Sequence, residues 1–334
     1  MFVNVTDRPR TARDPSTGLG AAVCEAAPEK PSRRAGESVP ETNTPVGRKA
    51  PCRRRGHMKF GISTFVTDEG IAPDELGAAA EQRGFDALFL AEHTHIPSSR
   101  RTPYPGGGEL PRHYYRTLDP FVSLTAAAVA TEHMLLATGI ALMIQRDPII
   151  TAKEVASLDR VSGGRAILGV GAGWNREEMR NHGTEPRGRG TLMDERVRAV
   201  QRLWTREEAE FHGEHVDIEP SYCWPKPVQR PHPPIYVGGE SQRSVERVAE
   251  YGGGWLPRAG TSDLSGRINR VRDRAGWRVP VSLYAAGDDP ATLEEYERAG
   301  VDRVLFYLPT VVRDETLRHL DRFAESARKS QLGS

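Results

Sequence analysis

Two runs of successive apolar residues enclose a helix-like segment in the middle of the chain. The runs are Met134–Met143 and Ala166–Val170, and the segment between them ends at Gly163-Gly164. Strands that are apolar at successive positions are typical of a parallel sheet buried on both faces. Helical periodicity with glycines at its end predicts a crossover helix between two such strands. We therefore predict a strand–helix–strand unit here.

The same unit recurs from Met58 to the end of the chain. Eight strands are predicted, each followed by a helical segment. They are placed at Lys59–Ser63, Ala87–Ala91, Leu135–Met143, Ala166–Val170, Ile235–Val237, Gly254–Leu256, Val281–Ala285 and Arg303–Tyr307. Eight β/α units in this length predict an α/β fold of the closed (β/α)8 barrel type, and a doubly wound open sheet is the alternative.

Two segments depart from this alternation of strands and helices. Residues 205–233 contain the proline-rich sequence WPKPVQRPHPP and predict an excursion after strand four with a short hairpin. The connection Pro97–Arg116 is longer than most loops, which makes it a functional candidate.

Residues 1–57 differ in composition from residues 58–334. They are rich in Pro, Arg, Ser, Thr and Glu and have few large apolar residues, so we expect disorder. We expect the natural protein to begin at Met58, with residues 1–57 arising from an early start codon. The barrel domain then covers residues 58–334.

Charge and cysteine content restrict the class of protein. Residues 1–57 hold 11 basic and 6 acidic residues, and the remainder is mildly acidic, so nucleic acid is not expected as a partner. The three cysteines are far apart, which fits a cytoplasmic protein without disulfides. No apolar run approaches the roughly 18 residues that span a membrane. We expect a small-molecule substrate and a homodimer.

Candidate chemistry lies at the carboxyl ends of the predicted strands, where such barrels carry their active sites. Glu92 and His93 end strand two, and a histidine beside a carboxylate there is a candidate proton donor or cofactor contact. Ser63, at the end of strand one, is a candidate cofactor contact. The histidines lack metal-ligand spacing, so no metal is predicted.

Two glycine-containing turns follow strands four and five. They consist of Gly171, Ala172, Gly173 and Trp174, and of Gly238, Gly239, Glu240 and Ser241. Each turn leads into a helix, and helix-terminal N–H groups favour a phosphate. The alternative is an ordinary strand-to-helix turn with Ser241 as an N-cap. Two such turns on neighbouring strands favour a phosphate-bearing cofactor.

Residues 58–329 resemble the luciferase-like monooxygenase superfamily, and in particular its coenzyme F420-dependent oxidoreductases from actinobacteria. The resemblance rests on LFLAEHTHIP, on DRVSGGRAILGVGAGWNREE, and on WPKPVQRPHPPIYVGGES. It implies a barrel with an excursion after strand four and a flavin or deazaflavin across the barrel mouth. The two glycine turns would hold its phosphate.

The resemblance also implies individual roles. His93 falls where deazaflavin members place a histidine near the reactive ring carbon. A cis peptide bond is expected between Gly139 and Ile140, where a bulge would push the backbone under the cofactor ring. Trp174 stands where sugar-phosphate dehydrogenases of the family have a glutamate, which argues against that substrate class.

These features predict hydride transfer between coenzyme F420 and a small organic substrate. One alternative is an FMN-dependent monooxygenase that uses oxygen on the same fold. An alternative of another class is a non-catalytic protein that binds a flavin or deazaflavin.

Overall fold

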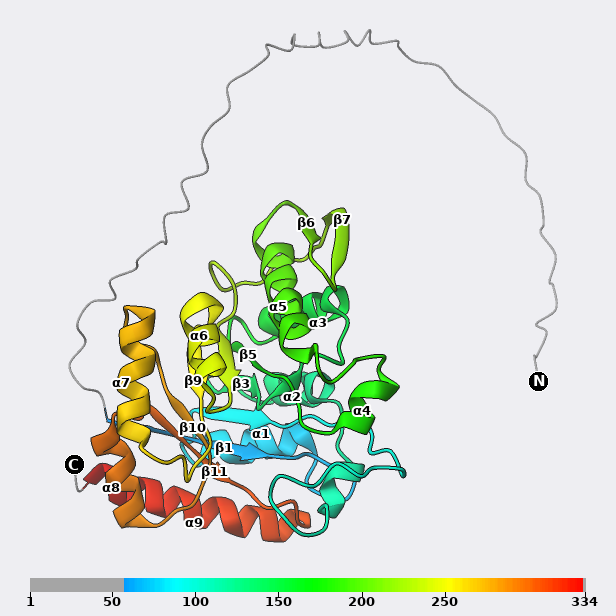
Figure 1. Ribbon diagram of the computed structural model, residues 1–334. Helices are drawn as coiled ribbons and strands as arrows, with labels where there is room; N and C mark the ends of the chain where they lie inside the picture. Colours follow the sequence, from blue (N-terminus) through cyan, green and yellow to red (C-terminus); the bar gives the residue numbers. More distant parts are fainter. Residues whose placement is uncertain (1–56, 333–334) are drawn as a thin grey trace, which may run out of the picture. The chain divides into compact units, whose positions relative to one another are not determined.

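A ring of parallel strands forms the centre of the molecule (Figure 1). The computed structural model describes residues 57–332, so the predictions for residues 1–56 lie outside the described part. Within it, eight parallel strands are ordered β10 (Ser282–Ala286), β11 (Arg303–Tyr307), β1 (Lys59–Thr64), β2 (Ala87–Leu90), β3 (Leu135–Thr138), β5 (Ala166–Gly171), β8 (Ile235–Gly238) and β9 (Gly254–Leu256). Bridges Trp255–Val281 and Arg258–Tyr284 link β9 to β10. The chain therefore forms the predicted, nearly closed barrel and not an open sheet.

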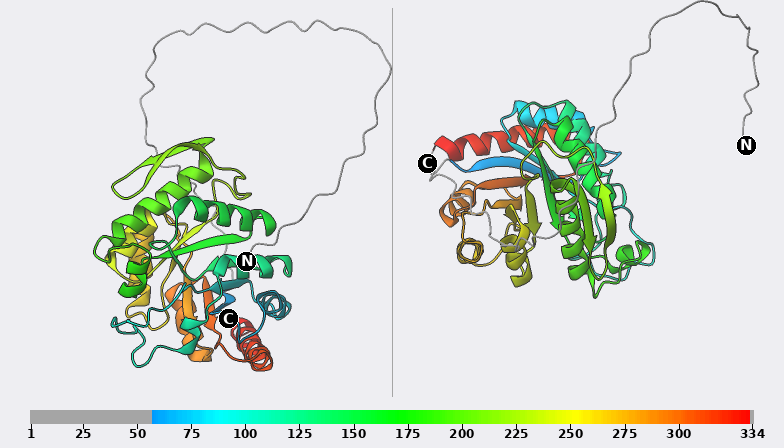
Figure 2. Two further views of the ribbon diagram at one scale, coloured as in Figure 1. Left: turned by 90° about the vertical axis from the view of Figure 1, so that its right-hand side faces the viewer. Right: turned by 90° about the horizontal axis from the view of Figure 1, so that it is seen from above.

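Helices surround the strands (Figure 2). They are α1 (Pro73–Gln82), α2 (Pro120–Val129), α3 (Pro148–Val161), α4 (Arg176–Asn181), α5 (Arg189–Thr205), α6 (Gln242–Tyr251), α7 (Leu264–Ala275), α8 (Pro290–Ala299) and α9 (Arg313–Leu332). Three of them begin with an aspartate whose side chain accepts backbone N–H groups, followed by proline: Asp119, Asp147 and Asp289. Proline has the φ angle of the first helical turn and lacks the N–H that would be unpaired there, so sequence fixes these starts. None of the described helices has the length and apolarity to cross a bilayer.

The third predicted strand is interrupted. Residues 135–143 form β3 and a separate short strand β4 (Ala141–Leu142), and both pair with β5 in parallel. The interruption is at Gly139 and Ile140, and the peptide bond between them is cis. This is the bond to which the resemblance assigns a cis peptide.

The excursion after strand four is an antiparallel hairpin of β6 (Glu208–His212) and β7 (Asp217–Tyr222). It stands at one edge of the barrel, beside α5, in Figures 1 and 2. The long connection after β2 contains one short 3-10 helix, η1 (Arg112–Tyr115). Both departures from the repeating pattern are therefore real insertions between barrel units.

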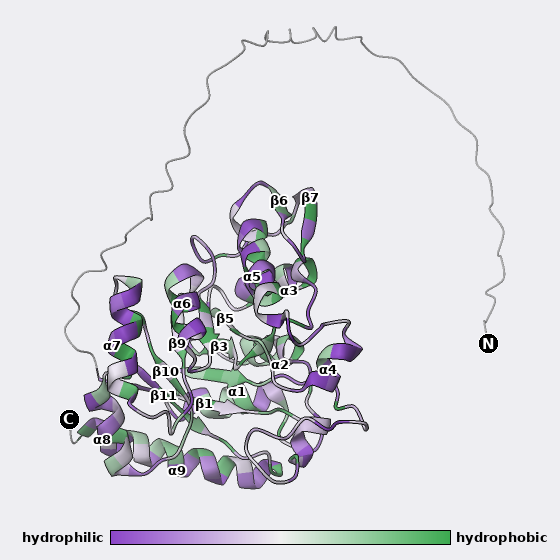
Figure 3. Cartoon of the chain, viewed as in Figure 1, coloured by the Kyte–Doolittle hydropathy of each residue, from purple (hydrophilic) through white to green (hydrophobic). Residues whose placement is uncertain are grey.

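The barrel interior is filled by a small apolar cluster. Its members come from successive strands and are Ala87, Phe89, Ala137, Ile167, Tyr236, Leu256 and Leu305. A larger apolar layer lies between the strands and the helices, so the strands are apolar on both faces. Figure 3 shows this pattern, with apolar strands inside and polar outer helix faces. A filled interior leaves the carboxyl-end mouth of the barrel as the place for a site.

Candidate active site

His93 lies just after β2, at the carboxyl end of the barrel. Its Nδ1 is 2.7 Å from Oε2 of Glu178, and the indole N–H of Trp174 donates to its Nε2 at 3.3 Å. An N–H donor at Nε2 requires a lone pair there, so Nδ1 carries the proton and donates it to the carboxylate. The structure therefore holds His93 in one neutral tautomer, with an unprotonated Nε2 beside Trp174.

Glu178 is a partner of His93 that was not predicted from the sequence. It lies on α4 and is fully buried, and its second oxygen accepts the backbone N–H of Thr94 at 3.2 Å. A buried carboxylate with two donors orients the imidazole as the carboxylate of a catalytic triad does. Glu178 was detectable only as one of two adjacent glutamates after the first glycine turn. The buried carboxylate of Glu178 and the indole of Trp174 thus contact opposite nitrogens of the His93 ring.

Glu92 is buried and has partners other than His93. Its carboxylate accepts the backbone N–H of Leu142 at 2.6 Å and pairs with Arg146 at 2.6 Å. Burial acts to lower the pKa of Arg146, but Glu92, Glu154 and Asp119 raise that pKa above its ordinary value overall. Glu92 thus joins the end of β2 to β4 through the Leu142 N–H and holds Arg146 in a buried ion pair, and its expected catalytic role stays a prediction.

Aromatic side chains from the long connection cover His93. The ring of Tyr114 is 4.9 Å from that of His93 and 6.2 Å from Trp174, and Tyr104 lies 5.4 Å from Tyr114. Burial and the contact with Tyr104 hold the pKa of Tyr114 well above its usual range, so its hydroxyl stays protonated. The long connection thus places aromatic rings beside the histidine, and the phenol of Tyr114 is neutral.

Ile140 joins the two glycine turns into one surface. A Cβ at Gly171 would lie 1.9 Å from Cδ1 of Ile140, and a Cβ at Gly238 would lie 3.0 Å from its Cγ2. The sequence predicts that the two turns hold the phosphate of a cofactor. The structure shows that at both positions the side chain of Ile140 uses the space. The turns and Ile140 nevertheless form one continuous wall of the barrel mouth.

Gly139 packs closely against Tyr284 and Phe89. A Cβ there would lie 2.8 Å from Cε2 of Tyr284 and 3.1 Å from Cβ of Phe89. Burial raises the pKa of Tyr284 above its ordinary value, so its phenol is neutral, and its ring packs against Gly139. A larger residue at 139 would therefore displace Tyr284 before it met any ligand.

The second turn has the expected N-cap, and its phosphate-binding role stays a prediction. Gly239 has φ of 98°, which favours glycine, and Ser241 caps α6 by accepting the N–H of Ser244 at 3.2 Å. The Glu240 carboxylate accepts the N–H of Arg258 at 2.9 Å and so holds the loop after β9. Gly173, in the first turn, has φ of 62° and lies between strand end and helix, as Ala172 and Trp174 do.

Ser63 is not available to a ligand. It is fully buried, and its hydroxyl donates to the carbonyl of Phe306 at 3.2 Å and accepts the N–H of Ala285 at 3.3 Å. Ala285 has φ of 58°, an unfavourable conformation for a residue with a side chain. The structure corrects the expected cofactor contact: Ser63 fastens β1 to β10 and β11.

Asn175 directly follows Trp174 and is 1% exposed. Both its Nδ2 and its Oδ1 lack a hydrogen-bond partner within residues 57–332. An unpaired buried amide costs about 1–3 kcal/mol, so a partner from a ligand would satisfy it. In the same range no group of three or more His, Cys, Asp and Glu side chains could hold a metal ion.

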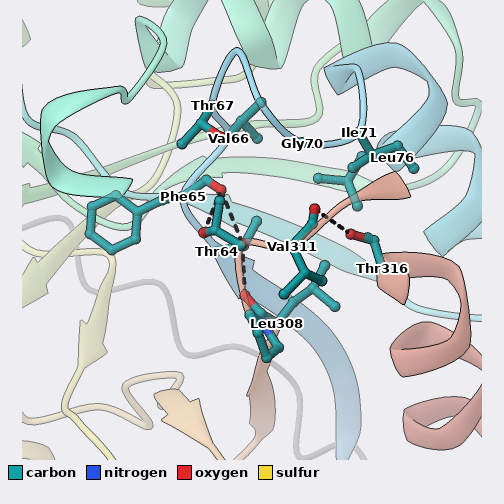
Figure 4. Close-up of a pocket in the computed structure, with 12 residues that line it drawn as sticks. Thr64, Phe65, Val66, Thr67, Gly70, Ile71, Leu76, Leu308, Val311 and Thr316 are labelled. Atoms are coloured by element: carbon teal, nitrogen blue, oxygen red, sulfur yellow. Dashed lines mark hydrogen bonds between the residues drawn. The ribbon is translucent and has the colours of Figure 1, made fainter. Parts of the chain in front are cut away.

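The ends of β1 and β11 form a closed lip next to this mouth. The space there, lined by Thr64, Leu308 and their neighbours, holds only about 10 Å³, roughly one water. Figure 4 shows the Thr64 hydroxyl directed at the carbonyl of Leu308, a 2.8 Å hydrogen bond that closes it. This lip supports the barrel and cannot take a substrate.

Relatives with this sequence pattern include proteins with two kinds of cofactor. An uncharacterised protein of Mycobacterium tuberculosis is 38% identical over 276 residues, covering 80% of this chain and 98% of its own length. An F420-dependent hydroxymycolic acid dehydrogenase from the same organism is 26% identical, and the match covers 70% of this chain and 60% of that protein. An FMNH2-dependent dimethylsulfone monooxygenase of Pseudomonas putida is 30% identical, and the match covers 49% of this chain and 47% of that protein.

Solved structures share the fold. The monooxygenase RslO1 from Streptomyces bottropensis has a TM-score of 0.68 at 22% identity, covering 80% of this chain and 98% of that one. The coenzyme F420-dependent tetrahydromethanopterin reductase from Methanopyrus kandleri has a TM-score of 0.64 at 18% identity. The match covers 81% of this chain and 98% of that one. The family description "luciferase-like monooxygenase" matches residues 62–331. The chain therefore belongs to the luciferase-like monooxygenase family of oxidoreductases.

Proposed function

We propose that this enzyme transfers a hydride between coenzyme F420 and a small organic substrate. The observation that carries the proposal is the Glu178–His93–Trp174 arrangement at the barrel mouth. Hydride transfer to or from an alcohol or carbonyl also moves a proton on oxygen, and a neutral imidazole with a free lone pair accepts such a proton.

The residues divide this work among themselves. Glu178 keeps the proton on Nδ1 and would stabilise the imidazolium that forms when Nε2 takes a proton from a substrate hydroxyl. The 3.3 Å contact of Trp174 with Nε2 is long for a hydrogen bond, so a substrate hydroxyl can replace it. Tyr104 and Tyr114 exclude water from this side. The hydride itself is the contribution of the deazaflavin when it is bound.

The cofactor would lie along the wall formed by Ile140 and the two glycine turns. The N-terminus of α6 follows one turn and the unpaired amide of Asn175 follows the other. Helix-terminal N–H groups suit the negative charge of a phosphate, and the amide can bond to phosphate or sugar oxygens and hydroxyls. These groups fit a phosphate-bearing flavin or deazaflavin.

An FMN-dependent monooxygenase is the competing proposal, favoured by the relative that uses FMNH2. An anaerobic assay with oxidised F420 and a panel of small alcohols separates the two. Our proposal predicts that an alcohol of the panel bleaches the F420 absorbance without oxygen. The proposal would be contradicted if no alcohol bleached F420 and reduced FMN supported oxygen-dependent product formation.

Replacing Asn175 with leucine should move stability and binding in opposite directions. Leucine has a similar shape and removes the unpaired buried amide, so the apoprotein should gain about 1 kcal/mol in free energy of unfolding. The cofactor should bind about 10-fold more weakly, because it loses a hydrogen-bond partner. Urea unfolding and fluorescence titration measure the two effects. Unchanged cofactor affinity would show that Asn175 does not face the cofactor.

A further inference from the structure

Four arginine side chains surround a hollow between α4 and the start of α5. It has a volume of about 500 Å³ and is bordered by Arg176, Arg180, Glu185, Pro186, Arg187 and Arg189. Four positive charges against the one negative charge of Glu185 leave a net charge of +3 in its lining. Such a concentration of like charge attracts anions.

The arginines of this hollow are not neutralised by the protein. Within residues 57–332 none of the four makes an ion pair, and Arg189 donates only to the carbonyl of Pro186, at 2.7 Å. Nearby, Arg243 and Arg247 are both paired with Asp194. Unpaired like charges repel one another, so the cluster costs stability unless an anion binds between them.

The hollow follows the first glycine turn closely along the chain, and the start of α5 at its other side contacts α6. Arg176 is two residues beyond Trp174, a distance of about 7 Å at most along the chain. On the other side, Arg247 of α6 donates to the carbonyl of Gly190 at 3.1 Å, which joins the start of α5 to the helix after the second turn. A chain that leaves a phosphate at the first turn therefore needs only a short path to Arg176, the nearest of the arginines in sequence.

We propose that this hollow binds a carboxylate-bearing tail that continues beyond the phosphate of the cofactor. The inference rests on the proposed function, because FMN ends at its phosphate whereas coenzyme F420 continues into a chain of glutamates. Guanidinium groups bind carboxylates in a planar, two-point geometry. Three of the four arginines are solvent-exposed, so the contribution falls as salt rises.

The test uses the full chain and two deazaflavin cofactors, both with the phosphate, one without glutamates and one with at least about four. Fluorescence titration at low salt measures both dissociation constants. The double variant Arg180→Glu/Arg187→Glu should bind the glutamate-bearing form about 10-fold more weakly, since it reverses two exposed charges. It should bind the form without glutamates as the original chain does.

Arg160→Glu/Arg328→Glu is the matched control. It makes the same change in net charge at exposed positions on α3 and α9. Equal affinity of the original chain for both cofactor forms, or equal weakening by variant and control, would overturn the inference while deazaflavin binding stands. Binding of FMN but of neither deazaflavin would remove the proposed function and the inference together.

Discussion

Replacing Glu178 with glutamine is expected to slow hydride transfer by at least about 10²-fold while the barrel stays folded. A carboxylate only accepts hydrogen bonds, so it holds the proton of His93 on Nδ1. Glutamine can turn its NH2 toward Nδ1 and shift the proton to Nε2, which then can no longer accept one. Single-turnover kinetics, with the fastest substrate from the alcohol panel, measure the rate.

Two further readouts separate this role from a structural one. The 15N chemical shifts of the His93 ring report which nitrogen is protonated, and they should exchange places in the variant. Glu177→Gln is the control, because the carboxylate of Glu177 lies on the same helix but accepts from the Thr102 hydroxyl at 2.6 Å. Equal rates in the two variants, with an unchanged tautomer, would refute the orienting role of Glu178.

Gly169→Ala is expected to lower the free energy of unfolding by at least about 3 kcal/mol. A Cβ at this position would lie 2.0 Å from the carbonyl oxygen of Thr138 on the neighbouring strand. Backbone in the middle of a buried sheet cannot move aside cheaply. Because Thr138 precedes Gly139 and Ile140, any displacement also reaches the wall on which the cofactor would lie.

Chemical unfolding followed by circular dichroism measures the loss. Gly287→Ala is the matched control, since a Cβ there meets nothing within 4 Å and the position has no positive φ. The control should change the free energy of unfolding by less than about 1 kcal/mol. A Gly169 variant as stable as this control would show that β3 and β5 can separate.

Most of the barrel was predictable from sequence because its strands are buried on both faces. Apolar runs such as Ala166–Val170 and helix starts such as Asp147-Pro148 carry their own local signals. The break in the third strand carries a weaker signal, a single glycine inside an apolar run. Residues 135–143 read as one apolar run, and only the resemblance pointed to the bond at Gly139, which the structure shows as cis.

The site was less predictable because its contacts join distant residues. Glu92 adjoins His93 in sequence, but successive side chains at a strand end point in different directions, so the two have different partners. The true partner, Glu178, is 85 residues away. Ser63 was misassigned for a similar reason: its place at the end of β1 was predictable, but its bonds to β10 and β11 were not.

Equilibrium titration of the apoprotein with coenzyme F420 and with FMN, in separate and competing samples, tests the proposed cofactor most directly. The arginine hollow that follows the first glycine turn favours the more anionic of the two ligands. We predict a dissociation constant for F420 at least about 10-fold below that for FMN, a difference of about 1.4 kcal/mol. Tighter binding of FMN, with F420 unable to displace it, would contradict the account.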